Sequence, residues 1–518
     1  MSTLRLFVGW CLVFGTFAHG YLENTDAVVT LHAARALWHR GDPGLLAEDP
    51  LLTPAERQAI AHSGQTLPGS GGKQYAQFAI GHQVLLVPCV ALGEWCARRF
   101  PAAERELGSW HGDDPAFGRH FFVRFFASWL PVPFAAGSAV LLFWLARTLG
   151  SSAREAGLVM LCVVAATQML AGASETMSDG PGMCLLLATA LAALRYERGL
   201  AGARALVALG LLGGATVLVR YPNAIPVAVC GVLAAWAAWR RQRRDLCWLA
   251  VGVLPGCVLL LLANWLRFGN VFETGYSGGA NAHWFAMPWK WGIPLVLASP
   301  CKGILWFSVL LWPALALGLA RPRAVGAMAW AVLLLPVLLV AHTRGWSGAQ
   351  CWGIRYLTPS VVLFCTVQLA LGKPWQRWPR CFSLTVLLGC LIGVGGLLTP
   401  YRGQQYLAAK ATAVAYAPQI ANQGLDPADA YHTDLRFSPL HTHWLYALQG
   451  ERLERDLPAA TAALFGVRVP ADTPPVLHED RGFRHVWWRV LPLPWWGGGL
   501  WLLACAVAVV QAGRRICR

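Results

Sequence analysis

Apolar stretches long enough to cross a lipid bilayer recur along nearly the whole chain. A membrane-spanning helix needs roughly 17–25 consecutive, mainly apolar residues, and the sequence contains many stretches of that length. Hydrophobic residues make up 56% of the 518 residues, and charged residues make up 13%, about half of the roughly 25% that is typical of soluble domains. A chain with so few charges is solvated mostly by hydrocarbon, and the sequence therefore predicts an all-α polytopic membrane protein.

The apolar stretches predict a bundle of about twelve transmembrane helices. The first stretch is interpreted as an uncleaved span, because no small-residue cleavage site of a signal peptide follows it. The expected spans cover residues 4–20, 120–147, 156–173, 180–195, 204–219, 222–239, 247–266, 303–320, 325–342, 356–372, 382–399 and 495–512.

The distribution of positive charge predicts which side of the membrane each loop faces. A net charge of +16 would suggest nucleic acid as a partner of a soluble protein. Here the arginines gather in short loops between apolar stretches, as in WRRQRRD at 239–245, which is the pattern of the positive-inside rule. The pattern indicates membrane lipids, and no nucleic acid, as partners. We expect these loops and both termini to face the cytoplasm of a protein in the inner (plasma) membrane.

The segment QYAQFAIGHQVLLVPCVALGEW at 74–95 is also apolar enough to span. Counting it as a span would place every later arginine cluster outside. We therefore predict that it is a re-entrant or interface-lying hairpin on the outer side. Gly81, His82 and Pro88 suit a broken element that protein shields from lipid.

This topology leaves five polar segments on the extracytoplasmic side, and the last of them is long enough to form a small outer domain. The five segments are 20–119, 174–180, 267–302, 343–356 and 400–494. We predict a transmembrane catalytic domain over 1–399, the outer domain over 400–494, and a last transmembrane helix with a basic cytoplasmic tail over 495–518.

Cysteine and histidine residues show no spacing that is typical of a metal site. Most cysteines lie in apolar stretches, where they act as small hydrophobic residues, while Cys301 and Cys351 lie in outer loops and are candidates for a disulfide. Structural or interfacial roles are expected for the outer histidines His82, His283, His342, His441 and His443.

Asp26 lies where the first apolar stretch ends and a helix is expected to begin. A carboxylate at this place suits a helix N-terminus, so a capping role and a catalytic role are equally compatible with the spacing. Val28, Leu31, Ala34 and Leu37 recur at helical spacing, which predicts an amphipathic helix over 27–40 that lies in the membrane interface.

A second pair of carboxylates, Glu175 and Asp179, lies four residues apart in the second outer loop. Asp179 would cap the next helix and Glu175 would be solvated if their roles were only structural. Carboxylates thus occur in two outer loops within the first four spans. Together they favour a functional role more strongly than the carboxylates of either loop do alone.

Basic residues at the outer boundary are candidates for binding phosphate. A single arginine there is usually a side chain that reaches the lipid head groups, but five basic residues near helix ends broken by Gly or Pro indicate a phosphate site, because Arg and Lys are the usual donors to phosphate oxygens. The five residues are Lys73, Arg220, Lys302, Arg344 and Arg355.

Several segments resemble the GT-C superfamily of membrane glycosyltransferases. Asp26, Ala34-Arg35 and Gly41-Asp42 follow the spacing of a first-loop motif of this superfamily, and the best match is to protein O-mannosyltransferases and bacterial lipid A aminoarabinose transferases. The chain departs from the motif at Ala27, Thr30 and Pro43, where that group carries an acidic residue, an aromatic residue and Trp. Further loops resemble bacterial members at SETMSDGPG (174–182), SPCKGILWFS (299–308), CWGIRYLTPS (351–360) and RFSPLHTHW (436–444).

The resemblance implies transfer of a sugar from a polyprenyl phosphate to an acceptor hydroxyl of a lipid, glycan or protein, with inversion at the anomeric carbon. Asp26 would be the catalytic base. Lys302, Arg355 and either Arg220 or Lys73 would bind the leaving phosphate, while Glu175 or Asp179 would orient the sugar or these cations. A divalent metal is compatible with this chemistry, although nothing in the sequence indicates one.

There are two alternatives to this function. The first is a transporter or flippase of lipid-linked sugars, which should show repeated halves that this sequence lacks. The second is a non-catalytic GT-C-like scaffold, which the loss of an acidic residue at Ala27 keeps open.

Overall fold

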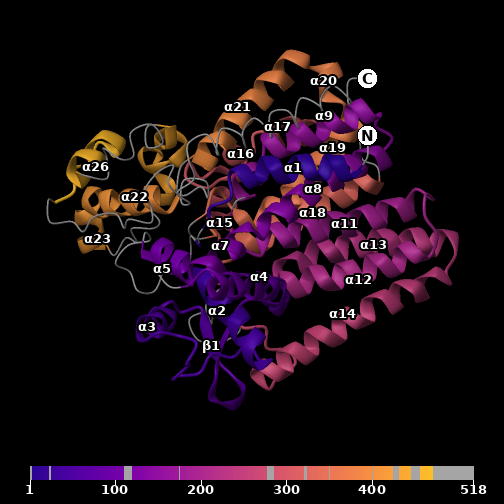
Figure 1. The fold of residues 1–518 in the computed structure, drawn as a ribbon. Helices are drawn as coiled ribbons and strands as arrows, with labels where there is room; N and C mark the ends of the chain where they lie inside the picture. The colour runs from indigo at the N-terminus through magenta and orange to yellow at the C-terminus, as the bar shows by residue number, and fades with distance from the viewer. Residues whose placement is uncertain are drawn as a thin grey trace.

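The fold is a bundle of long helices with smaller elements gathered at one end (Figure 1). The computed structural model describes residues 3–20, 22, 25–109, 120–173, 175–276, 285–319, 324–348, 351–398, 401–423, 431–444 and 456–470. Helices make up nearly all of the structured part of these residues, with a single short hairpin of strands. The predicted all-α membrane fold is therefore confirmed.

The bundle is built from helices of the predicted spans. Its elements are α1 (Thr3–Thr16), α7 (Phe121–Trp129), α8 (Pro131–Thr148), α9 (Ala153–Ala165), α10 (Met169–Gly172), α11 (Asp179–Glu197), α12 (Arg204–Val219), η2 (Tyr221–Asn223), α13 (Ala224–Arg241), α14 (Asp245–Phe268), α15 (Trp289–Ala298), α16 (Ile304–Phe307), α17 (Leu311–Leu319), α18 (Ala324–Ala341), η4 (Arg355–Leu357), α19 (Thr358–Gly372), α20 (Pro374–Arg377) and α21 (Pro379–Leu398).

Six helices of the described residues are long and apolar enough to cross a membrane, so the count of twelve spans is not confirmed. One of the six joins α7 and α8 into a single stretch over Phe121–Thr148. The predicted span 303–320 is broken into the short helices α16 and α17, with Ser308 between them. The predicted last span, 495–512, lies outside the described residues.

Helices α12 and α14 pack closely because glycines line their contact. A Cβ atom added at Gly210 would lie 2.4 Å from the backbone of Gly252, and one added at Gly214 would lie 2.8 Å from Gly256. Both helices thus carry two glycines four residues apart, the small-residue pattern that lets membrane helices approach each other. The contact holds α14 at the edge of the bundle, where most of its apolar side chains are exposed (Figure 1).

The first outer loop folds into a compact layer at one end of the bundle. Its elements are α2 (Thr25–Arg40), α3 (Pro54–His62), β1 (Thr66–Pro68), η1 (Ser70–Gly72), β2 (Gln74–Ala76), α4 (Ile80–Arg99) and α5 (Pro101–Ser109). Strands β1 and β2 pair antiparallel, with Leu67 opposite Tyr75. A capping box, in which Thr53 and Glu56 satisfy each other's backbone N–H groups, fixes the start of α3.

Helix α2 begins where the sequence predicted, but the prediction of an amphipathic helix is wrong. Every residue from 29 to 36 is buried, because α4 and α7 cover one face of α2 and the segment from Leu45 to Ala76 covers the other. Its polar residues are buried among other polar groups: Arg35, for example, donates to the carbonyl of Leu51 at 3.1 Å. A helix enclosed by protein on both sides needs no polar face.

The predicted hairpin at 74–95 is also wrong. Strand β2 occupies its first residues, and α4 then runs without a break for 20 residues, with Pro88 inside it. Helix α4 packs on α2 and α7. The protein contacts that the sequence analysis expected are present, but they stabilise a continuous helix.

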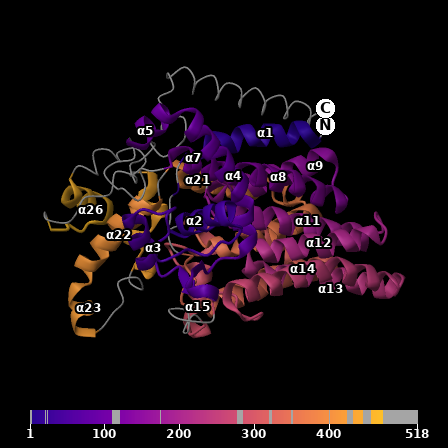
Figure 2. The same ribbon diagram turned by 60° about the horizontal axis from the view of Figure 1, so that its bottom comes forward.

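Elements of the polar segment after α21 lie at the same end of the bundle as α3, as both ribbon views show (Figures 1 and 2). They are α22 (Tyr401–Ala415), α23 (Ala417–Gln423), η5 (Leu435–Phe437) and α26 (Leu457–Phe465). Residues of α22, η5 and α26 share a core cluster of their own, which reaches the bundle at Cys301. Ser438 Oγ also donates to the carbonyl of Pro300 at 2.5 Å, so the tail holds the loop between α15 and α16.

Candidate active site

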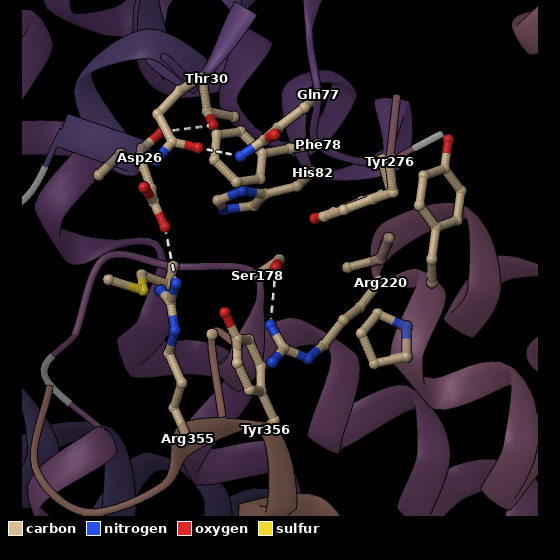
Figure 3. A pocket seen from close by; sticks show the side chains of 18 of the residues that line it. Asp26, Thr30, Gln77, Phe78, His82, Ser178, Arg220, Tyr276, Arg355 and Tyr356 are labelled. Atoms are coloured by element: carbon tan, nitrogen blue, oxygen red, sulfur yellow. Dashed lines mark hydrogen bonds and ion pairs between the residues drawn. The ribbon is translucent and has the colours of Figure 1, made fainter. Parts of the chain in front are cut away.

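A polar cavity of about 430 Å³ lies where the first outer loop meets the bundle. Side chains from the start of α2, the joint between β2 and α4, the segment before α11, the end of α12 and the segment before α19 converge on it (Figure 3). The residues that the argument below uses are Asp26, Gln77, Ala79, His82, Ser178, Arg220, Tyr276, Arg355 and Tyr356. Segments far apart in the sequence thus build one chamber.

Asp26 and Arg355 form an ion pair at this cavity. Arg355 Nη2 donates to Asp26 Oδ2 at 2.6 Å, and the two side chains are 8% and 17% exposed. Asp26 lies in the first turn of α2, where the partial charge of the helix end also favours an anion. Its carboxylate points across the cavity to Arg355 (Figure 3), so the base and the phosphate ligand that the sequence predicted lie in direct contact.

Arg220 and Asp179 form a second ion pair next to the first. Arg220 Nη2 lies 2.7 Å from Asp179 Oδ1, and Arg220 Nη1 donates to Ser178 Oγ at 3.2 Å. The ring of Tyr356 lies beside both arginines, with the Cζ atoms of Arg220 and Arg355 5.4 and 5.3 Å from its centre. Tyr356 therefore spaces two cations that would otherwise repel each other, at distances typical of cation–π contacts.

His82 is a cavity residue to which the sequence analysis gave only a structural or interfacial role. Its side chain is 3% exposed, and its Nε2 atom has no hydrogen-bond partner within the described part of the protein. The ring lies on the same side of the cavity as Asp26 and Gln77 and faces Arg220 and Tyr356 (Figure 3). In the sequence, His82 lies in an apolar segment, and no second histidine, cysteine or carboxylate follows it at the spacing of a metal site. Only the polarity of its side chain could have indicated a role in the cavity.

Lys302 and Glu175 do not line the cavity but lie behind it. Lys302 is fully buried, and its Nζ donates to the carbonyl of Cys351 at 2.5 Å, while Glu175 Oε1 accepts from the backbone N–H of Trp352 at 3.1 Å. Burial lowers the pKa of Lys302 from its ordinary value, and Cys351 and Glu175 oppose this shift. Both side chains hold the segment that leads into Arg355, so the direct phosphate contact predicted for Lys302 is absent from the cavity as it stands.

Lys73 lies on the other side of α4, away from the polar cavity. Its Nζ pairs with Asp42 Oδ2 at 2.5 Å, and Asp42 and Tyr75 line an apolar groove of about 720 Å³ between α2, α4, α12 and α14. Arg267 also lines this groove and was missed by the sequence analysis, although it is a cation at the outer end of an apolar stretch. Arg267 is 1% exposed, and among the described residues no carboxylate forms an ion pair with it.

The disulfide considered for Cys301 and Cys351 is not formed, because both are free thiols. The Sγ of Cys301 lies 2.9 Å from the carbonyl oxygen of Tyr431, and that of Cys351 lies 3.2 Å from the carbonyl oxygen of Gly348. Within the described ranges, no group of three His, Cys, Asp or Glu side chains is arranged to hold a metal ion.

Residues 110–274 match the model of the dolichyl-phosphate-mannose-protein mannosyltransferase family. Among solved structures, the chain is similar to ArnT from Cupriavidus metallidurans bound to undecaprenyl phosphate, with 14% identity, a TM-score of 0.48, and coverage of 89% of this chain and 74% of that one. It is also similar to the Archaeoglobus fulgidus oligosaccharyltransferase in the apo form, with 10% identity, a TM-score of 0.41, and coverage of 84% and 60%. No curated protein matches the chain.

The family match covers part of the site. Glu175, Asp179 and Arg220 lie inside the matched residues, whereas Asp26 and Arg355 lie outside them. The match agrees with the likeness that the sequence showed in its outer loops, and several helices are apolar enough to span a membrane. The protein is thus a multi-pass membrane protein, and its residues 110–274 are similar to the dolichyl-phosphate-mannose-protein mannosyltransferase family.

Proposed function

We propose that this protein transfers a sugar from a polyprenyl phosphate to an acceptor hydroxyl on the extracytoplasmic face of the inner membrane. The observation that carries the proposal is the pairing of two cavities. A polar chamber with a carboxylate and two arginines adjoins an apolar groove, and Val219 lines both. A donor with a hydrocarbon tail and a sugar head has the same two-part character.

In the proposed reaction, the acceptor hydroxyl attacks the anomeric carbon from the face opposite the phosphate. The bond between that carbon and the phosphate oxygen breaks, and its electron pair leaves with the polyprenyl phosphate. Asp26 accepts the proton of the hydroxyl, which is general-base catalysis. Attack from the opposite face inverts the anomeric centre, and by analogy with glycoside hydrolysis the transition state has oxocarbenium character.

Arg355 and Arg220 are the proposed ligands of the leaving phosphate. Both face the cavity, and guanidinium groups offer paired donors to phosphate oxygens. In the empty site Arg355 is paired with Asp26. A bound phosphate would compete for Arg355 and so release the Asp26 carboxylate to accept a proton.

The other proposed site residues act through neighbours. Asp179 holds Arg220, and Glu175 and Lys302 hold the segment before Arg355. Lys73, paired with Asp42 at the groove, is proposed to contact the donor from the lipid side. The outer segment 400–494 is proposed to help select the acceptor, because its described helices lie at the same end of the molecule as the first outer loop (Figure 2).

The proposal is tested with purified protein and a panel of polyprenyl phosphate sugars, each offered with candidate lipid, glycan and protein acceptors. We expect release of polyprenyl phosphate and formation of a glycoside with inverted configuration. Reconstituted vesicles with a labelled donor in one leaflet provide the contrasting readout. Movement of intact donor between leaflets without transfer would establish a transporter instead, and binding without either process would establish a scaffold.

A further inference from the structure

We propose that the amino-terminal turn of α4 and the imidazole of His82 bind the phosphate group of the donor. The proposal rests on the proposed function, because it takes a lipid-linked phosphate as the ligand. It places the phosphate at the start of α4, a position that the arginines of the cavity do not define by themselves. It also gives a role to the buried ring of His82.

The first turn of α4 divides the polar cavity from the apolar groove. Ala79 and His82 line the cavity, whereas Ile80, Gly81 and Val84 line the groove. A donor whose sugar lies in the cavity and whose tail lies in the groove must pass this turn. The phosphate is the only group between sugar and tail, so it would lie next to the start of α4.

The start of α4 offers backbone donors to such an anion. Ala79 is the N-cap residue and has the extended backbone of a cap (φ −61°, ψ 136°), but its side chain makes no cap hydrogen bond. The first N–H groups of a helix have no partner within the helix. Together with the helix dipole they form an anion-binding site of the kind that commonly holds phosphate.

His82 supplies the independent observation that points to a ligand here. Its side chain is 97% buried, and in the described structure Nε2 has no hydrogen-bond partner although it borders the cavity. Side chains of a helix tilt toward its N-terminus, so the ring of His82 leans toward the first turn of α4 at the edge of the cavity. In the tautomer with the proton on Nε2, the ring donates one further hydrogen bond to a phosphate oxygen.

The surrounding contacts hold this turn rigidly between two cations. A Cβ atom added at Gly81 would lie 2.6 Å from the carbonyl oxygen of Leu218, so α4 starts in close contact with the end of α12, where Arg220 follows. On the groove side, Arg267 Nη1 donates to the carbonyl oxygens of Ala76 and Phe78 at 3.3 and 2.9 Å. The turn is therefore fixed before any ligand binds.

The first test compares Ala79→Asp with Ala79→Asn. Both side chains cap a helix about equally well, and both add the same bulk at the buried Ala79, but only Asp adds a negative charge where the phosphate would lie. We expect Ala79→Asp to bind undecaprenyl phosphate about tenfold or more weakly than Ala79→Asn. Binding of undecaprenol, which lacks the phosphate, should be equal in the two variants.

The second test uses His82→Gln, which keeps a donor, and His82→Leu, which does not. Loss of a hydrogen bond to a charged group should weaken undecaprenyl phosphate binding about tenfold to a hundredfold in His82→Leu, with a smaller effect in His82→Gln and no effect on undecaprenol. Equal affinities in both matched pairs would overturn the site. Inorganic phosphate that binds and responds to these variants while undecaprenyl phosphate does not would also overturn it.

These outcomes differ from a failure of the proposed function. If the wild-type protein binds undecaprenyl phosphate through this turn but transfers no sugar from any polyprenyl phosphate donor, the site stands and the enzymatic proposal fails. If transfer occurs and the affinities for undecaprenyl phosphate are equal within both matched pairs, the enzymatic proposal stands and the site fails.

Discussion

The ring of Tyr356 lies between the two arginines of the cavity and sets the distance between their charges. We expect Tyr356→Leu to weaken donor binding roughly fivefold to thirtyfold, because two cation–π contacts of about 0.5–1 kcal/mol each are lost. Tyr356→Phe keeps the ring and should bind the donor nearly as well as the wild type. Titration of both variants with undecaprenyl phosphate checks this, and equal loss in the two would assign the effect to the hydroxyl group instead.

Asp26→Asn tests the proposed base while keeping the shape of the side chain and a hydrogen-bond acceptor for Arg355. Transfer should fall about a hundredfold to ten-thousandfold, the usual cost of losing a general base, and the melting temperature should also fall, because the largely buried Arg355 keeps only a neutral partner. Initial rates and thermal melting of the purified variant give the two readouts. Glu23→Gln, three residues earlier and outside the described residues, is the control and should be mild. Near-normal transfer by Asp26→Asn would leave the carboxylate with a structural role only.

Lys302→Met tests whether this buried lysine supports the site from behind. Its removal leaves Glu175 buried without the nearby positive charge that interacts with it, and a buried charge that loses its compensation is destabilising. We therefore expect a marked drop in melting temperature. The double variant Glu175→Gln/Lys302→Met should recover much of that loss, because the Gln oxygen still accepts from Trp352. No recovery would mean that the two side chains act independently.

At the level of residues, the sequence singled out charged residues at the cavity, but it predicted neither their pairing nor the neutral residues beside them. Asp26, Asp179, Arg220 and Arg355 lie at or beside one cavity, in agreement with the rule that charges near membrane-spanning segments usually have a specific role. Lys302 occurs in a similar sequence context but is buried behind the cavity. Sequence context alone does not distinguish a side chain that binds phosphate from one that supports the residues around it. His82 has no partner at a regular spacing, so only the fold reveals its position.

At the level of elements, the glycine contact between α12 and α14 controls the width of the apolar groove. Gly252→Ala would place a Cβ atom 2.4 Å from the carbonyl oxygen of Val207 and should lower stability by about 1–3 kcal/mol, the usual cost of overpacking. Gly231→Ala, on α13, meets nothing within 4 Å and is the matched control. Thermal melting in detergent compares them, and a Gly252→Ala protein as stable as Gly231→Ala would mean that the two helices separate freely.

Most long helices could be predicted from apolar length alone, because a stretch that fills the bilayer must satisfy its own backbone hydrogen bonds. The wrong predictions concern helices that are surrounded by other parts of the same chain and not by lipid or water. Helix α2 is enclosed on both faces, so its pattern of apolar residues did not mark an interface. Helix α4 continues through Pro88 because its contacts with α2 and α7 support it, which no local pattern shows.

At the level of the whole molecule, the charge distribution predicts one orientation in the membrane. Single cysteines at positions 61, 110 and 242, in a background without accessible native cysteines, would be labelled with a membrane-impermeant reagent. We expect positions 61 and 110 to react from outside and position 242 to react only after the membrane is opened, as the positive-inside rule requires. Labelling of 61 and 110 from opposite faces would make α4 a span and reverse every later loop.

The ion pair between Asp26 and Arg355 joins two residues that are 329 positions apart in the chain. A ribosome adds roughly 5–20 residues per second, so about 16–66 s pass between the synthesis of the carboxylate and that of its partner. During this time the first outer loop is already made, but one wall of the cavity does not exist. A nascent chain, or one truncated before residue 355, therefore lacks one wall of the chamber and the partner of Asp26.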